Sequence, residues 1–250
     1  SGKPCWNNTP WPWRRLLPKP MDRPDEAAAA TEFDQWANAG RAESMAEGHR
    51  GVTEAAIAGW TLGTADAVLD VGCGNGWAVQ ELVKRGAGKG YGVDIAPRMI
   101  DLARGHSQGD ARFEFEVSPA EKLPFGDAHM SHVLNVESLY YYPDPGAALV
   151  EWARVTRPGG RLAIVVDLYE ESPATHAWID ALDVSVHLLS SPNICAMAQA
   201  AGWTNIRSEQ VLDPRPLKPE AGFTISKYWP SYQMYLDYRS TGALVVHAVR

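Results

Sequence analysis

A glycine-rich loop follows a short apolar run in residues 68–77, which read VLDVGCGNGW. The apolar run has the character of a buried strand, and the glycines break it into a tight turn. Glycine lets backbone N–H groups turn inward and approach a ligand without a Cβ in the way. An aspartate at the strand end can orient the loop or meet a cationic group. The candidate ligand-binding residues of this stretch are Asp70, Gly72, Cys73, Gly74 and Gly76.

The spacing of these glycines separates the ligands that such loops bind. A dinucleotide loop follows GxGxxG, and its third glycine position must be small so that helix and strand can approach closely. That position is Trp77 here. A loop of the GxxxxGK[ST] type needs a lysine directly after its last glycine, and Trp77 stands in that place too. The remaining pattern, DxGxGxG, disfavours both a dinucleotide and a nucleoside triphosphate.

A second carboxylate stands at the end of the next apolar run. Asp94 closes residues 90–94, and its two oxygens can accept hydrogen bonds from two hydroxyl groups of a ligand. Hydrogen bonds to an ionised carboxylate are about twice as strong as neutral ones. Ile95 and Met99 follow closely and can sandwich a flat base. The loop and the two aspartates together indicate a ligand-binding site.

Hydrophobic patterning predicts the elements that position these residues. Strand-length apolar runs alternate with amphipathic helical stretches, which calls for a parallel sheet with helices on both faces. The expected strands are residues 67–71, 90–94, 113–117, 132–136, 161–167, 206–211 and 243–249. The expected helices are residues 25–40, 44–59, 78–85, 97–104, 147–156 and 192–201, the last capped by Ser191 and stopped by Gly202.

Three further stretches agree with the loop in order and spacing. They are YGVDIAPRMIDLAR (91–104), AEKLPFGDAHMSHVLNVESLYYYPDP (120–145) and VTRPGGRLAIVV (155–166). With the loop they resemble the class I S-adenosylmethionine-dependent methyltransferases, well over residues 66–167 and loosely over 191–250. The resemblance implies a Rossmann-like α/β fold: a seven-stranded, mostly parallel sheet with an antiparallel last strand and helices on both faces. It also implies S-adenosyl-L-methionine as cofactor and S-adenosyl-L-homocysteine as product.

The adenine end of the site departs from the family pattern. Members often carry an acidic or polar residue directly before the alanine of the AExLPF motif, where it accepts a hydrogen bond from the adenine amino group. Pro119 occupies that position and offers neither a side-chain acceptor nor an N–H. Neighbouring residues are therefore expected to substitute, and Trp36 is placed to close over the pocket. The remaining cofactor-binding candidates are Ser118, Ala120, Glu121, Asn135 and Trp36.

The chain divides into three parts by composition and pattern. Residues 1–24 form an arm with six prolines and three tryptophans, residues 25–60 a helical N-terminal cap, and residues 61–250 the methyltransferase domain. The arm is expected to strap over its own domain, to exchange with a second copy in a homodimer, or to cover the site. Two long connections, 168–190 and 213–242, are predicted to be substrate-side insertions.

The second substrate is expected outside the carboxyl ends of the strands, where open α/β sheets bind ligands. The side chains expected there are Tyr141, Asp167, Tyr169, Glu170, Glu171 and Trp178, with Met45 and His49 from the cap. Such a lining suits a modest-sized molecule that is cationic or carries a titratable nucleophile. The candidate catalytic residues are His176, His187, Glu137 and Tyr140. No group of residues has the spacing of metal ligands, so no metal is expected.

Composition limits the partners and the compartment. A net charge of −7 and a pI near 5.5 argue against nucleic acid or an anionic membrane as the main partner. The longest apolar runs are far below the length of a membrane span. Three cysteines without a pairing motif indicate a reducing, cytoplasmic location, with a removed upstream targeting segment as the open alternative.

The function predicted from these features is methyl transfer from S-adenosylmethionine to an oxygen, nitrogen, carbon or sulfur atom of a small molecule. One alternative is a non-catalytic protein of the same fold that binds S-adenosylmethionine or scaffolds a partner. A second alternative, an NAD-dependent oxidoreductase, is disfavoured by Trp77.

Overall fold

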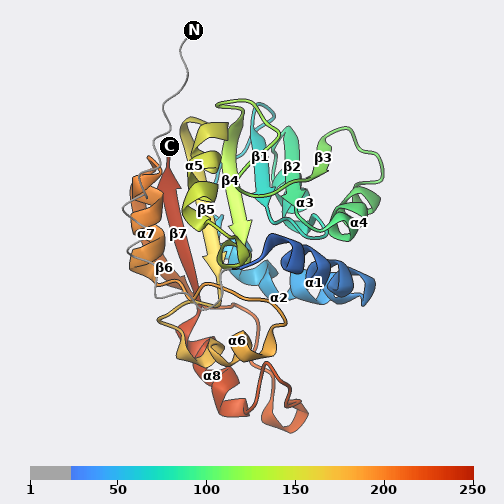
Figure 1. The fold of residues 1–250 in the computed structure, drawn as a ribbon, viewed down its shortest axis with the longest axis vertical. Helices are drawn as coiled ribbons and strands as arrows, with labels where there is room; N and C mark the ends of the chain where they lie inside the picture. The colour runs from blue at the N-terminus through green and yellow to red at the C-terminus, as the bar shows by residue number, and fades with distance from the viewer. Residues whose placement is uncertain (1–23) are drawn as a thin grey trace.

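A single seven-stranded sheet forms the centre of the computed structural model, which describes residues 24–250 (Figure 1). The strands are β1 Ala67–Val71, β2 Lys89–Asp94, β3 Phe113–Val117, β4 Met130–Val136, β5 Thr156–Val166, β6 Thr204–Val211 and β7 Ala243–Val249. Their order across the sheet is β3-β2-β1-β4-β5-β7-β6. β1 to β5 pair in parallel, and β7 runs antiparallel to β5 and β6. The mostly parallel sheet with an antiparallel last strand is therefore confirmed.

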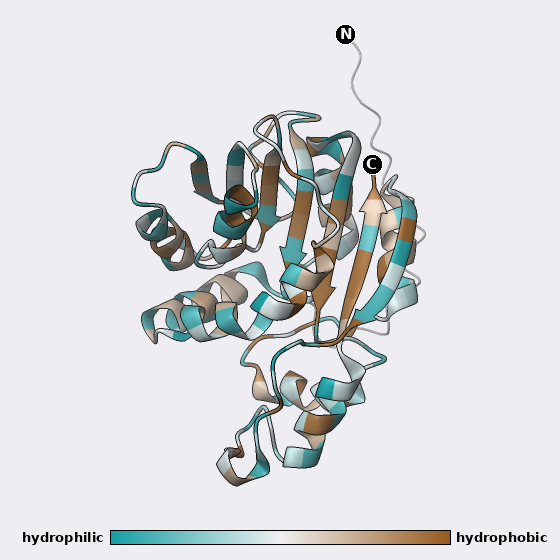
Figure 2. Ribbon diagram, turned by 180° about the vertical axis from the view of Figure 1, so that it is seen from behind, coloured by the Kyte–Doolittle hydropathy of each residue, from teal (hydrophilic) through white to brown (hydrophobic). Residues whose placement is uncertain are grey.

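Residues 24–250 form eight α-helices in addition to the sheet. They are α1 Glu26–Asn38, α2 Arg41–Ala56, α3 Trp77–Lys84, α4 Pro97–Ser107, α5 Pro145–Val155, α6 Ala177–Ala181, α7 Ser191–Ala200 and α8 Tyr232–Thr241. Side chains alternate along a strand, so neighbours serve opposite faces. Val68 packs with Leu82 of α3, while Leu69 packs in the cluster of α5 and α7. Both faces are covered, which explains why the central strands are apolar along their length (Figure 2).

The order of the strands reverses beside β1, because β2 lies on one side of it and β4 on the other. The register pairs Val71 with Val93 and Asp70 with Leu134. The ends of these three strands therefore meet at one edge of the sheet, a position where open α/β sheets bind ligands. The helices α1 and α2 lie across this edge (Figure 1).

Two long segments form a lobe beyond the same edge of the sheet (Figure 1). They are residues 168–190, with α6, and residues 213–242, with α8. Tyr235 and Tyr238 of α8 pack with Ala174 and with Trp178 of α6. Neither helix is predicted from the sequence, because both are short and α8 has a largely polar, tyrosine-rich sequence with little apolar periodicity.

Several predicted boundaries shift for local reasons. α7 begins at Ser191, because Ser190 rather than Ser191 is the N-cap and forms a capping box with Asn193. α1 ends at Asn38, and Gly40, at φ 68°, starts α2 directly. β5 begins at Thr156, earlier than predicted.

The predictions for the proline- and tryptophan-rich arm fall outside the described residues, apart from its last residue, Pro24. Among the helices of residues 24–250, none has both the length and the apolar character needed to cross a membrane.

Candidate functional site

A cavity lies where β1, β2 and β4 end, and its empty space, including the mouth, is about 970 Å³. We call it the first cavity. Nearly all of the predicted cofactor-binding residues line it. These are Asp70, Gly72, Cys73, Gly74, Asp94, Ile95, Met99, Ser118, Ala120 and Glu121. Three predicted residues, Gly76, Asn135 and Trp36, are absent from this lining.

Side chains at the end of β4 and just after it hold the backbone at the start of the glycine loop. Asn135 is fully buried, and its Nδ2 donates to the Val71 carbonyl at 2.8 Å. The Ser138 hydroxyl donates to the same carbonyl at 3.1 Å. Gly72 has φ 76°, and a Cβ there would stand 2.3 Å from the Ser138 Oγ. Asn135 therefore supports the loop from beneath, and only glycine fits at position 72.

The loop also bonds directly to the carboxylate that follows β2. Gly74 donates its N–H to Asp94 Oδ2 at 2.9 Å, and Ala96 donates to Oδ1 at 2.9 Å. Gly74 has φ 52°, and a Cβ built on it meets no atom within 4 Å, so it would stand in open space. Two backbone N–H groups thus fix Asp94 while its carboxylate still lines the cavity.

The first cavity carries two buried carboxylates without a cation beside them in the described residues. Asp70 is 2% exposed, and its Oδ1 has no hydrogen-bond partner among residues 24–250. Burial, and then the charge of Asp94, holds the pKa of Asp70 well above its usual range. Burial also raises the pKa of Asp94, against the two backbone bonds that lower it. The cavity therefore fits a ligand that brings positive charge and hydrogen-bond donors.

The other end of the first cavity is partly apolar and partly polar. Ser118 donates its Oγ to the Lys122 carbonyl at 2.9 Å and its N–H to the Asp94 carbonyl at 3.0 Å. Glu121 accepts from the Asp144 N–H at 3.2 Å, and burial raises its pKa. Met99 is buried on the same lining. The segment that follows β3 thus presents acceptors to the cavity despite Pro119.

A second, larger cavity adjoins the first, with about 1680 Å³ of empty space including its mouth. We call it the second cavity; α1, α2, the residues after β4 and β5, and the lobe surround it. Trp36 lines this cavity rather than the first. Five residues line both cavities: Phe33, Met45, His49, Glu137 and Tyr141.

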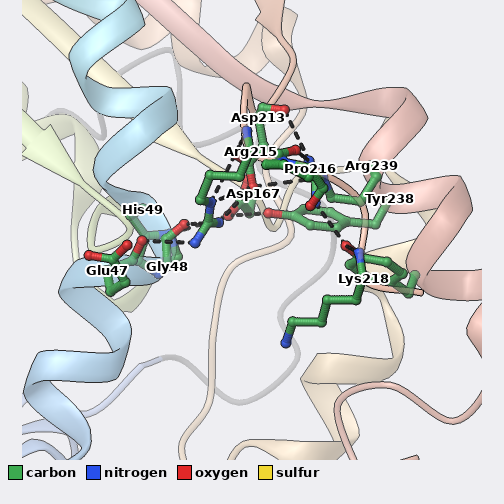
Figure 3. Close-up of polar contacts among 11 residues, drawn as sticks. Glu47, Gly48, His49, Asp167, Asp213, Arg215, Pro216, Lys218, Tyr238 and Arg239 are labelled. Carbon is green, nitrogen blue, oxygen red and sulfur yellow. Dashed lines mark hydrogen bonds and ion pairs between the residues drawn. The ribbon is translucent and has the colours of Figure 1, made fainter. Parts of the chain in front are cut away.

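Three titratable side chains meet at the junction of the cavities, and we call His49, Glu137 and Asp167 the junction trio. His49 Nδ1 lies 3.3 Å from Asp167 Oδ2, to which the Tyr238 hydroxyl also donates at 3.0 Å. Figure 3 shows His49 on α2 and Tyr238 on α8 on either side of Asp167. Asp167 is 3% exposed, so its carboxylate depends on these partners.

Glu137 completes the trio from an uncommon backbone conformation. Its φ of 53° is left-handed, which bulky residues adopt mainly where surrounding structure enforces it. One carboxylate oxygen accepts the Asp167 N–H and the other accepts the Tyr140 hydroxyl at 2.8 Å. Burial, reinforced by the charge of Asp167, raises the pKa of Glu137 to about 8.

The electrostatic state of His49 follows from the same contacts. Burial lowers its pKa, but the bond to Asp167 and the charges of Glu137 and Asp167 outweigh burial, so the pKa of His49 is raised above 6.5. The imidazole is thereby oriented through Nδ1, which leaves Nε2 for another partner. A histidine held in this way can accept a proton from a bound molecule.

The junction trio also corrects the expectation that no residues converge like metal ligands. One ligand atom of each lies within 4.8 Å of the others, a spacing that a metal ion could bridge. The three residues come from α2 and from the ends of two different strands, so no local spacing signals them. Both carboxylates already accept hydrogen bonds from Tyr238, Tyr140 or a backbone N–H, which favours proton handling over metal ligation.

Two predicted catalytic histidines lie away from this junction. Neither His176 nor His187 lines the first or the second cavity. His176 Nε2 bonds to the Tyr169 carbonyl at 3.2 Å, and the His187 N–H bonds to the Tyr140 carbonyl at 2.8 Å. Both therefore help to fold the segment after β5. Of the other two catalytic candidates, Glu137 lines both cavities and Tyr140 lines the second, so their catalytic roles stay predictions.

A guanidinium latch ties the lobe to α2 beside His49 (Figure 3). Arg215 donates to the carbonyls of Glu47 at 2.9 Å and Gly48 at 2.5 Å, and pairs with Asp213 at 2.6 Å. Arg239 donates to the Asp213 carbonyl at 3.0 Å. No sequence motif indicates this latch. The only signal was the aromatic content of the segment, namely Phe223, Tyr228, Trp229, Tyr232, Tyr235 and Tyr238.

The sheet topology and the glycine loop have the form that the methyltransferase resemblance implies, and comparison with known proteins agrees. Residues 69–164 match the family model described as a methyltransferase domain. A solved Haloferax volcanii complex joins the Trm112 methyltransferase activator to a protein classed as a methyltransferase. One of its chains is 30% identical, with a TM-score of 0.79 over 87% of this chain and 97% of that chain. The present chain therefore belongs to the S-adenosylmethionine-dependent methyltransferase family.

Curated relatives include two named methyltransferases that match part of the chain. Methyltransferase GfsG of Streptomyces halstedii is 29% identical over 53% of this chain and 49% of its own length. The 27-O-demethylrifamycin SV methyltransferase of Amycolatopsis mediterranei is 35% identical over 45% of this chain and 43% of its own. The matches thus span about half the length of these relatives.

Proposed function

We propose that this protein transfers a methyl group from S-adenosylmethionine in the first cavity to a small molecule in the second. The observation that supports this most is the shared lining of the two cavities, which lets two ligands meet inside the protein. When bound, the cofactor supplies a methyl group on a sulfonium, which needs an aligned nucleophile more than chemical assistance.

Each end of the first cavity suits one part of that cofactor. Asp94, fixed by Gly74 and Ala96, would accept the ribose hydroxyls. Asp70, with its unpartnered Oδ1, would face the cationic methionyl end. Ile95 and Met99 would hold the adenine between them.

The junction trio would prepare an acceptor that carries a proton on its nucleophile. His49 Nε2 takes the hydroxyl or amine proton while Asp167 holds Nδ1 and stabilises the imidazolium that forms. The nucleophile forms the new bond to the methyl carbon, the carbon–sulfur bond breaks, and its electron pair stays on sulfur. The products are the methylated acceptor and S-adenosylhomocysteine.

Glu137 and Tyr140 act as positioning residues in this scheme. Glu137 bonds to the backbone N–H of Asp167 and to the Tyr140 hydroxyl, so it holds the trio together. The aromatic side chains of Phe33 and Tyr141 lie at the same junction, with their rings 4.9 Å apart and nearly perpendicular. These rings would exclude water from the space between the two ligands.

The proposal is tested by incubating the protein with S-adenosylmethionine and fractions of a small-molecule metabolite extract, and quantifying S-adenosylhomocysteine. We expect product with at least one fraction and none with transfer RNA or duplex DNA. Methylation of nucleic acid alone, or no product from any fraction despite measurable cofactor binding, would contradict it. A parallel assay with a chelator separates the two uses of the trio: unchanged turnover supports proton transfer, whereas loss restored by a divalent cation would assign the trio to a metal.

A further inference from the structure

The second cavity contains two cations that have no carboxylate partner within residues 24–250. They are Arg41, in the first turn of α2, and Lys218, an exposed residue of the lobe. The other two cations of the lining, Arg215 and Arg239, both pair with Asp213. The lining of this cavity is therefore more basic than a protein with a net charge of −7 would suggest.

Arg41 is held in a fixed place without being neutralised. Its guanidinium lies 4.2 Å from the centroid of the Trp36 ring, and its Nη2 donates to the Tyr228 hydroxyl at 3.3 Å. Stacking on an aromatic ring leaves the edge of the planar guanidinium free to donate two parallel hydrogen bonds. The partner that such an edge fits best is a carboxylate.

Lys218 is anchored by its backbone while its amino group remains free. Its N–H bonds to the Tyr235 hydroxyl at 2.9 Å, and its carbonyl accepts from Tyr232 at 2.8 Å. The side chain extends away from the paired arginines (Figure 3). It adds a second positive charge to the wall of the same cavity.

The distance between Arg41 and the junction trio sets the length of the molecule that could use both. Arg41, Met45 and His49 follow one another along one side of α2, and all three line the second cavity. About two turns of helix separate Arg41 from His49, a rise of about 12 Å. Met45 lies between them on α2, and Phe33 and Tyr141 line the same cavity, so the lining suits an apolar or aromatic body.

We propose that the acceptor is an elongated carboxylate: its hydroxyl meets His49 at the junction, and its carboxylate binds Arg41 at the far end. This inference rests on the proposed function and refines the substrate class. It replaces the cationic acceptor that the acidic residues of the sequence suggested. Of those acids, Glu170 and Glu171 do not line the second cavity, Asp167 lies against His49, and Glu137 accepts two hydrogen bonds. The other two acids of the lining are paired as well, Asp213 with two arginines and Glu47 with Arg50.

The test uses two acceptor scaffolds, para-hydroxycinnamate and ω-hydroxydodecanoate, each as the carboxylate, the amide and the corresponding amine. Binding of each form is measured by ligand-observed NMR with the protein saturated in S-adenosylhomocysteine, and turnover by S-adenosylhomocysteine formation from S-adenosylmethionine. We expect at least one carboxylate to bind about tenfold or more tightly than its amide and amine.

Variants of Arg41 test whether this residue causes the preference for the carboxylate. Arg41→Gln should bring carboxylate and amide to equal affinity, and Arg41→Lys should restore part of the difference, because it returns the charge without the planar fork. Arg207→Gln, an exposed arginine of β6 outside both cavities, should keep the full preference.

Preference for an amide or amine, no difference in Arg41→Gln, or no binding of any form would overturn the inference. Turnover of the metabolite fractions by the same samples distinguishes this from failure of the proposed function. If a fraction still yields S-adenosylhomocysteine while the carboxylates show no preference, only the inference fails; if no fraction yields it, the proposed function fails as well.

Discussion

The two cavities that meet at the edge of the sheet are built in different ways. The first depends on backbone: the loop turns through left-handed glycines, and backbone N–H groups fix Asp94. The second depends on side chains that come from α1, α2, the strand ends and the lobe. A cavity made by backbone conformation tolerates little change, whereas one made by side chains can change its ligand residue by residue. The cofactor side is therefore expected to be constrained and the acceptor side adaptable.

All three residues of the junction trio line the second cavity, and two of them, His49 and Glu137, also line the first. His49→Gln should lower turnover by about 10²–10⁴-fold, because it removes the proton acceptor. Affinity for S-adenosylmethionine should change little, since the first cavity keeps its loop and carboxylates. The matched control is His129→Gln, whose imidazole bonds to the Tyr91 hydroxyl away from both cavities. Equal turnover in the two variants would remove His49 from the mechanism.

The same histidine predicts how turnover depends on pH. A base works in its deprotonated form, and the pKa of His49 is raised above 6.5 by Asp167 and Glu137 against the effect of burial. Turnover should therefore rise about tenfold per pH unit below that raised pKa and level off above it. Turnover rates measured between pH 5.5 and 9, at saturating cofactor, show this rise and plateau. A flat profile in the wild type would contradict proton transfer to His49.

Substitution of Asp94 in the first cavity should weaken cofactor binding and leave the rate of methyl transfer by the bound complex largely unchanged. Asp94→Ala should weaken S-adenosylmethionine binding at least about tenfold, because a charge-assisted contact contributes about 1.5–3 kcal/mol. Asp94→Asn keeps the shape and tests the charge alone. Asp101→Ala, an exposed carboxylate on the nearby helix α4, is the control. Unchanged affinity in both Asp94 variants would mean that the ribose is held elsewhere.

Asp70 should show that the first cavity is arranged for its ligand at the expense of stability. Its pKa is raised by burial and by Asp94, so the folded protein takes up a proton that the unfolded chain releases. Stability therefore falls as pH rises from the unfolded pKa of about 3.9 through the folded one. Asp70→Asn should raise the melting temperature of the ligand-free protein at pH 7.5, by about 2–4 °C for each kcal/mol recovered.

This gain in melting temperature should largely vanish near pH 3.5, where the Asp70 carboxyl is mostly protonated in both the folded and the unfolded wild-type protein. Cofactor binding should weaken in the same variant. A lower melting temperature at pH 7.5 would show that Asp70 is stabilising as it stands.

The contrast between the cavities also explains what the sequence could and could not predict. β1, β3 and β7 have the predicted bounds, because buried strands are short apolar runs with clear ends. The first cavity was predictable because Asp70 and the loop are contiguous and Asp94 ends the next strand. All three members of the trio were expected on the acceptor side, but their convergence was not predictable, since α2 and two strand ends meet only in the folded chain. Arg41 and Arg215 carry no local pattern at all, so their roles rest on the packing of the lobe against α2.

Calorimetry shows whether the first cavity binds the cofactor independently of the acceptor. Titration of the wild-type protein with S-adenosylmethionine and with S-adenosylhomocysteine, without any acceptor, should give one site per chain for each, and competition between them. His49→Gln should give the same isotherms, while Asp94→Asn should give at least about tenfold weaker ones. Absence of binding by both compounds in the wild type would contradict binding of the cofactor in the first cavity.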